Sequence, residues 1–332
     1  MAAGKLKDKL GDAVIDPRSK RLWKVALWVL VVILLINIFL GWYWSREPKM
    51  MTLEVRPNAV TGETFTREII RVSETLLEKP GGYLSNDVLP YSWWIDNMPN
   101  WEFGVIVQVR DVTRTMRRDI SRSQSQSQED RDLAIAEPLF NYDTSSWMLP
   151  STENEYRRGV NALERYLDRL IDGDAVFFSR ADNLNTWLAE VQSRLGSLSL
   201  QLSLSVGRSQ LELDREGAEL DMQLERDGEI LKTPWYLVDD VFYEARGATW
   251  ALVHLMRAAE VDFAPILRQK NATVSFRQVI RELEASQQPM RSPMVLNGSG
   301  FGIFPNHSLV MANYISRANA ALLDLRRLLA EG

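Results

Sequence analysis

The chain has 332 residues and a formal net charge of −5, with 39 lysine and arginine side chains against 44 aspartate and glutamate side chains. It contains no cysteine and only two histidines, which excludes disulfides, thiolate metal sites and a histidine metal cluster. The acidic balance also argues against nucleic-acid binding, which depends on clustered cations. We therefore expect no metal, no cofactor and no nucleic-acid partner.

Residues 1–21 form a short polar tail, and the most distinctive stretch of the sequence follows it. Residues 22–44 contain one charge, Lys24, and one amide, Asn37. A helix of that length extends roughly 35 Å, enough to cross a hydrocarbon core of about 30 Å. Aromatic rings that favour the headgroup layers lie near both ends, at Trp23, Trp28, Trp42, Tyr43 and Trp44. The pattern predicts a transmembrane anchor, in which Asn37 either bonds to a second helix or is hydrated at the interface.

The charges beside this span predict its orientation. Six basic residues precede it, whereas only Arg46 and Lys49 follow it closely. By the positive-inside rule, residues 1–21 are cytoplasmic and residues 45–332 are exported. A cleaved signal peptide is disfavoured, because the apolar run is longer than the usual length of about 7–15 residues and residues 41–45 lack a small-x-small cleavage site. The chain is therefore predicted to keep its anchor.

The segment after the anchor changes character twice. Residues 45–62 contain two prolines and no regular period, which predicts a stalk. Residues 63–150 then carry apolar residues at helical spacing. They predict one helix that stops before Pro80, one over residues 105–116, for which a strand is the alternative, and one within residues 129–141.

Residues 80–104 are predicted to be an aromatic-rich loop, because Pro90 and Pro99 interrupt any amphipathic helix. The stretch combines six aromatic with three acidic side chains, Tyr83, Tyr91, Trp93, Trp94, Trp101, Phe103, Asp87, Asp96 and Glu102. The favoured interpretation is an aromatic plug packed onto the helices, since aromatic rings bury the most area per residue.

Two functional interpretations of this loop remain beside the structural one. An exposed platform of Tyr83, Trp93, Trp94 and Trp101 would suit binding of a glycan or a protein. Alternatively, two carboxylates among Asp87, Asp96 and Glu102 would hydrolyse a glycosidic bond, which requires a defined separation between them.

Residues 151–332 are predicted to form a helical bundle. Thr152 and Glu155 match a capping box at the start of a helix that ends near Gly173. A leucine seam from Leu184 to Leu202 marks the next helix, and the two are expected to pack as an antiparallel hairpin. Residues 198–206 also alternate as a strand would, but the seam favours helix.

The remaining elements follow a charged segment. Short alternations allow a small β-hairpin near residues 208–226. A Thr-Pro pair then opens a long helix to about residue 260, with further helices around residues 276–283 and 315–329. His254 is interpreted as a packed core residue, and His307 as part of a helix start capped by Asn306 or Ser308. The predicted fold class is mainly α, with one N-terminal transmembrane helix followed by a large antiparallel helical bundle.

Two runs carry a resemblance, PGGYLSND at residues 80–87 and DNMPNWEFG at residues 96–104. They resemble an uncharacterised domain-of-unknown-function family of single-span inner-membrane proteins of Gram-negative bacteria. The likeness covers most of residues 50–330. It implies a bacterial inner-membrane location with residues 45–332 in the periplasm, and it implies no activity and no catalytic residues.

Two functions therefore stay open. The first is a membrane-anchored periplasmic protein that acts by interaction, as an envelope scaffold, assembly factor or adaptor. Its expected partners are the lipid bilayer and envelope proteins, with a homo-oligomer as an open alternative. The second is a membrane-tethered hydrolase or binder of cell-wall glycan, with peptidoglycan as partner, that uses residues 80–104. The first is favoured, because the sequence contains no recognisable catalytic motif.

Overall fold

The computed structural model describes residues 17–87, 97–123, 128–206, 233–290, 292, 294–298 and 304–331. This part is helical and contains no strand beyond one isolated bridge between Asn297 and Asn306, so the predicted mainly-α class is confirmed. Its helices are α2 (Pro17–Trp44), α3 (Glu63–Glu78), α4 (Asn97–Thr115) with a π-helical extension η2 (Met116–Ile120), α5 (Leu133–Phe140), α6 (Thr152–Asp172), α7 (Ala181–Ser205), a 3-10 turn η3 (Trp235–Leu237), α9 (Val238–Asp262), α10 (Ala264–Gln269), α11 (Thr273–Ser286) and α12 (His307–Glu331).

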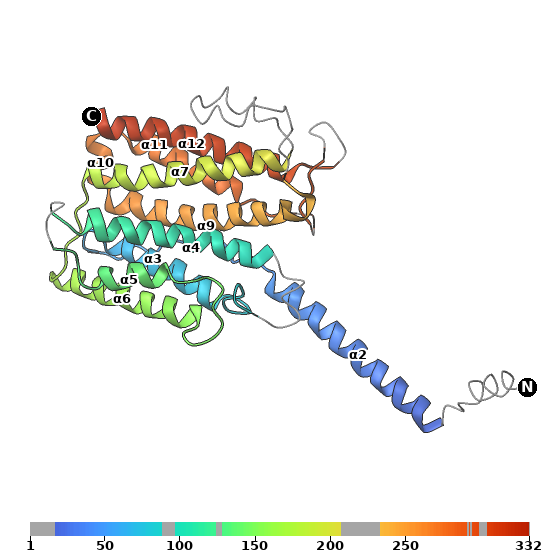
Figure 1. Ribbon diagram of the computed structural model, residues 1–332. Helices are drawn as coiled ribbons and strands as arrows, with labels where there is room; N and C mark the ends of the chain where they lie inside the picture. Colours follow the sequence, from blue (N-terminus) through green and yellow to red (C-terminus); the bar gives the residue numbers. More distant parts are fainter. Residues whose placement is uncertain are drawn as a thin grey trace, which may run out of the picture.

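Helix α2 stands apart from the other helices, which form one bundle (Figure 1). Its residues 21–44 form a segment that is long and apolar enough to cross a membrane, and almost all of their side chains are exposed. Asn37 donates its side-chain N–H to the carbonyl oxygen of Ile33 at 2.8 Å, so this amide is satisfied within its own helix. Trp44, in the last turn of α2, packs against the bundle.

The bundle is built around α4 and α9. These two helices pack side by side in the middle, with α3, α5 and α6 on one side and α7, α11 and α12 on the other (Figure 1). Gly104 and Gly247 allow the close approach, because a Cβ at either position would overlap backbone atoms of the facing helix. Helix α9 is buried over most of its circumference, as expected for a helix surrounded by others.

The stretch predicted as a loop over residues 80–104 ends in a helix. Helix α4 begins at Asn97 and includes residues 97–104 of the stretch. Met98, Trp101 and Val105 share one buried face, and Pro99 lies in the first turn, where its missing N–H breaks no intrahelical bond. The prediction failed here because Pro99 was interpreted as a helix breaker instead of a helix-start residue.

Helices α6 and α7 do not form the predicted antiparallel hairpin. Helix α6 packs on α3 and α5, whereas α7 packs on α12 across the bundle. The connection between them is extended, and its Phe177 inserts beside the rings of Phe65 and Phe263, 6.1 and 5.5 Å away. An apolar seam predicts that a helix is buried, but it does not identify the helix that buries it. The helical assignment of residues 198–206 is confirmed up to Ser205.

Of the two predicted helix caps, the structure confirms one and contradicts the other. Asn306 caps α12 as predicted, accepting the backbone N–H of Leu309 at 2.9 Å. The capping box does not form, because Thr152 is already the first residue of α6 and its hydroxyl donates to the carbonyl oxygen of Asp143 at 2.8 Å. The short helix α10 was missed. The predicted β-hairpin near residues 208–226 lies outside the described residues.

Segment 45–62 contains no regular element, as predicted for a stalk, but its first part lies on the bundle. Met50, Met51 and Leu53 pack against the core. The described loop residues 79–87, 141–151, 233–237, 287–290, 294–298 and 304–306 lie at the same end of the bundle as the exit of α2 (Figure 1). We call it the α2 end of the bundle.

Candidate functional site at the junction of α2 and the bundle

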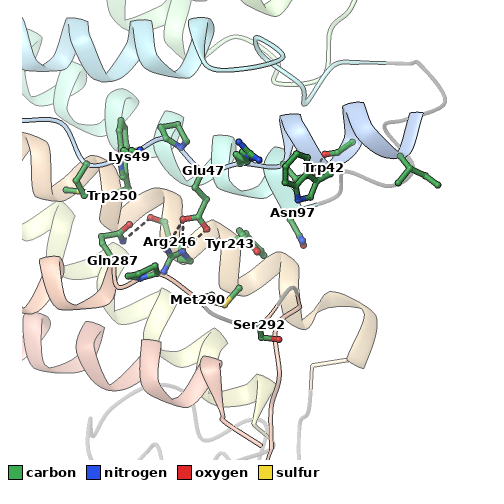
Figure 2. Close-up of a pocket in the computed structure, with 17 residues that line it drawn as sticks. Trp42, Glu47, Lys49, Asn97, Tyr243, Arg246, Trp250, Gln287, Met290 and Ser292 are labelled. Carbon is green, nitrogen blue, oxygen red and sulfur yellow. Dashed lines mark hydrogen bonds and ion pairs between the residues drawn. The ribbon is translucent and has the colours of Figure 1, made fainter. Parts of the chain in front are cut away.

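An open pocket of about 820 Å³ lies where α2 meets the bundle (Figure 2). The last turns of α2 and residues 45–50 form one wall. Asn97 at the start of α4, the N-terminal half of α9 and residues 287–292 form the others. Segments far apart in the sequence therefore meet here, and we call the site the junction pocket.

A buried arginine holds the pocket together. The Nε and Nη2 atoms of Arg246, on α9, donate to the Glu47 carboxylate at 2.8 and 2.6 Å. Its Nη1 donates to the carbonyl oxygens of Ser286 and Gln288 at 3.3 and 3.1 Å. Such a two-pronged charge-assisted contact is strong and directional. Arg246 thus fastens the segment after α2 to both α9 and the end of α11.

The rim of the pocket is cationic. The Arg46 guanidinium lies 3.9 Å from the ring centroid of Trp42, and Lys49 is exposed. Because Glu47 neutralises Arg246, these two side chains leave the described lining with excess positive charge. The walls between them are largely apolar, with Ile38 and Met290 among them.

Two lining residues have unsatisfied polar atoms. Trp250 Nε1 and Asn97 Oδ1 are buried and have no hydrogen-bond partner among the described residues. Gln287, in contrast, is engaged, since its Nε2 donates to the Thr249 hydroxyl at 2.7 Å. The pocket therefore offers cations at the rim and apolar walls. This arrangement suits binding of a group that is both apolar and anionic.

The predicted aromatic platform is only partly described. Tyr83 and Trp101 are buried, and the Tyr83 hydroxyl donates to the carbonyl oxygen of Thr144 at 3.0 Å. Burial raises the pKa of the Tyr83 hydroxyl well above its usual range. These two rings are therefore core residues, as the plug interpretation expects. Trp93 and Trp94 lie outside the described residues.

Glu102 proves to be a structural carboxylate. It is completely buried and pairs with the equally buried Lys79 at 2.5 Å. It also accepts the backbone N–H groups of Leu84 and Ser85, both at 2.8 Å. Burial raises the pKa of Glu102, and the neighbouring Lys79 opposes that shift. The carboxylate thus fixes the turn after α3. Of the other two acidic candidates, Asp87 is half-buried and Asp96 lies outside the described residues.

The histidines have structural partners. His254 Nδ1 lies 3.1 Å from Glu68 Oε1 of α3, and both side chains are buried. Its ring packs on Trp250 at 4.6 Å, which supports the interpretation of a core histidine. His307 Nδ1 accepts the backbone N–H of Leu296 at 2.9 Å. The described residues contain no cluster of His, Asp and Glu that could hold a metal ion.

Sequence reasoning missed the central residue of the pocket, Arg246. A signal was present, because Arg246 directly precedes residues 247–253, a run of small and apolar side chains without a charge. A buried charge of that kind needs a partner, and the partner comes from a distant segment, residue 47. Asn37, Trp23, Trp28, Trp42 and Trp44 all lie on α2, and of these only Trp42 lines the pocket.

Comparisons with known proteins add the family. No curated protein and no solved structure matches the chain. The model of an uncharacterised protein family conserved in bacteria, DUF2333, matches residues 17–332, which include α2 and the whole bundle. The chain therefore belongs to this bacterial family.

Proposed function

We propose that this protein is anchored in the bacterial inner membrane by α2 and acts by binding an envelope protein, as a scaffold, assembly factor or adaptor. In this proposal, residues 1–21 are cytoplasmic and residues 45–332 are periplasmic. The excess of basic residues before the span supports this orientation, and the family supports a bacterial protein. Reporter fusions after Glu47 and at Gly332 should both report the periplasmic side.

The observation that carries the binding role is the junction pocket. Its position at the end of the span brings it to the membrane surface, where envelope proteins with their own spans pass close by. The cations Arg46 and Lys49 flank apolar walls, so the pocket fits a partner segment with acidic and apolar side chains.

Site-specific crosslinking tests this proposal. A photoreactive amino acid at Tyr243 or at Met290, both of which line the pocket, is introduced into the full-length protein in its native membrane. We expect both positions to capture the same envelope protein and to lose it when Arg46 and Lys49 are changed to Glu. The exposed Leu323 on α12, outside the pocket, is the matched control position. Different partners at the two pocket positions, or capture that survives the charge reversal, would contradict the proposal.

The alternative, a hydrolase or binder of cell-wall glycan, finds no specific support in the described part of residues 80–104. Tyr83, Trp101 and Glu102 all point into the core, away from any glycan. That alternative would depend on Trp93, Trp94 and Asp96. A homo-oligomer is distinguished by the same experiment, because crosslinks would then join two copies of this chain.

A further inference from the structure

Outside α2, exposed aromatic rings gather at one end of the bundle. Among the described side chains outside α2, three aromatic residues are more than half exposed, Trp147 at 57%, Tyr236 at 60% and Phe304 at 67%. Met148 and Leu149, at 58% and 94%, extend the exposed apolar surface next to Trp147. The loops that hold these residues all lie at the α2 end of the bundle (Figure 1).

The loop with Trp147 is joined to the exit of α2 by a chain of contacts. Trp44 packs against Gly81, where a Cβ would come within 2.8 Å of its ring. Two residues on, the Tyr83 hydroxyl donates to the carbonyl oxygen of Thr144 at 3.0 Å. Asn86 Nδ2 donates to the carbonyl oxygen of Ser146 at 2.8 Å. The exposed side chains are therefore displayed beside the end of α2 by a loop that is tied to the bundle.

We propose that the α2 end of the bundle rests on the bilayer surface, with Trp147, Met148 and Leu149 inserted into the headgroup layer. This inference rests on the proposed membrane anchoring and goes beyond it, because a span alone leaves the orientation of the bundle open. Indole rings favour the membrane interface, and exposed methionine and leucine side chains gain from leaving water.

Geometry favours a bilayer over a protein as the occupant. If α2 spans the membrane, Trp42 and Trp44 at its end lie in the headgroup layer, and the contacts above hold the Trp147 loop next to them. Three separate loops expose aromatic rings at this one end, as a broad flat surface requires. Because α2 already tethers the bundle, insertion is intramolecular and a small apolar loop suffices. The junction pocket then opens at the level of the lipid headgroups.

The absence of cysteine makes a direct test simple. Single cysteines replace Met148, Leu30 in the middle of α2, or Val274, and each carries an environment-sensitive fluorophore in the full-length protein. The protein is reconstituted in nanodiscs of phosphatidylethanolamine and phosphatidylglycerol, either without a quencher or with doxyl lipids whose nitroxide lies near the headgroup (shallow) or near the bilayer centre (deep). Val274 is the matched control, because it is 74% exposed and is the second residue of α11, directly after α10, which lies at the end of the bundle opposite α2 (Figure 1).

We expect the shallow doxyl lipids to quench the fluorophore at residue 148 and the deep ones to quench it at residue 30, each at least twofold. Neither should change the fluorescence at residue 274. Leu149→Asp should reduce quenching at residue 148 without changing it at residue 30. If the fluorophore at residue 30 is quenched but that at residue 148 is quenched no more than that at residue 274, the inference is overturned and the membrane anchoring stands. No quenching at residue 30 would overturn the anchoring itself, and the inference with it.

Discussion

The carboxylate of Glu47 and the guanidinium of Arg246 meet at 2.6 to 3.0 Å although 199 residues separate them in the chain. The Arg246 side chain is almost completely buried, whereas Glu47 keeps 22% of its side-chain exposure. The pair joins the segment that leaves α2 to the central helix of the bundle. Since a buried guanidinium is costly without a counter-charge, Glu47 should matter for stability as well as for the shape of the pocket.

Glu47→Gln should lower the free energy of unfolding by about 1–3 kcal/mol, because the amide keeps the shape but leaves Arg246 without a counter-charge. Glu54→Gln is the matched control. Glu54 is 71% exposed and lies 3.7 Å from Arg71, so its loss should cost at most about 0.5 kcal/mol. Thermal melts of the purified full-length protein measure both. Equal midpoints for the two variants would show that the Glu47 pair does not stabilise the junction.

The contact between α4 and α9 gives a second prediction. A Cβ on Gly247 would overlap the backbone carbonyl of Trp101, so Gly247→Ala should separate the two central helices and cost about 1–3 kcal/mol or more. Gly196 on α7 is the control, because a Cβ there meets only Asn319 Nδ2 at 3.8 Å. Gly196→Ala should stabilise by up to about 1 kcal/mol through helix propensity. Opposite shifts in the melting midpoint are expected, and a neutral Gly247→Ala would contradict the close packing.

Asp262 predicts a pH dependence of stability. Its carboxylate accepts the backbone N–H of Phe65 at 2.7 Å, and burial raises its pKa from 3.8 to about 6. The folded state therefore binds the proton more tightly than the unfolded state. This contribution is fully present below about pH 4 and is lost as the pH rises to about 6, amounting to about 3 kcal/mol at most. In Asp262→Asn that fall should disappear, which denaturant titrations of both proteins at pH 4, 5, 6 and 7 would detect. Curves that stay parallel across this range would contradict the prediction.

Substitutions in the ion pair of Glu102 with Lys79 distinguish a structural role of Glu102 from a catalytic one. Glu102→Gln should cost about 3–5 kcal/mol, because it leaves Lys79 buried without a counter-charge. The double variant Lys79→Met with Glu102→Gln should recover much of that loss, since neither charge then remains in the core and the amide oxygen still accepts a backbone N–H of the turn. Thermal melts of the single and double variants provide the comparison. A Glu102→Gln protein with unchanged stability that has lost activity on isolated peptidoglycan would instead favour the hydrolase interpretation.

The sequence by itself determined the candidate membrane span and the helices, because both follow from local rules. Length and apolar composition predict the span, and apolar spacing of three and four residues predicts the helices. The side-chain cap by Asn306 was also within reach, since a capping residue bonds to an N–H only three positions away. Pro99 was ambiguous, because proline both ends helices and begins them.

Only the tertiary structure decided which helices meet and which charges pair. The apolar seams of α6 and α7 predicted correctly that these helices are buried. Helix α3 packs on α6 and helix α12 packs on α7, and an apolar stripe in the sequence does not specify that partner. Glu102 is a catalytic candidate by sequence, but in the structure it forms a buried ion pair with Lys79. Arg246 holds the junction pocket together because it pairs with Glu47, and that pairing depends on how the whole chain folds. Hydrophobic periodicity is a short-range signal, whereas sites are built from contacts between residues that are distant in sequence.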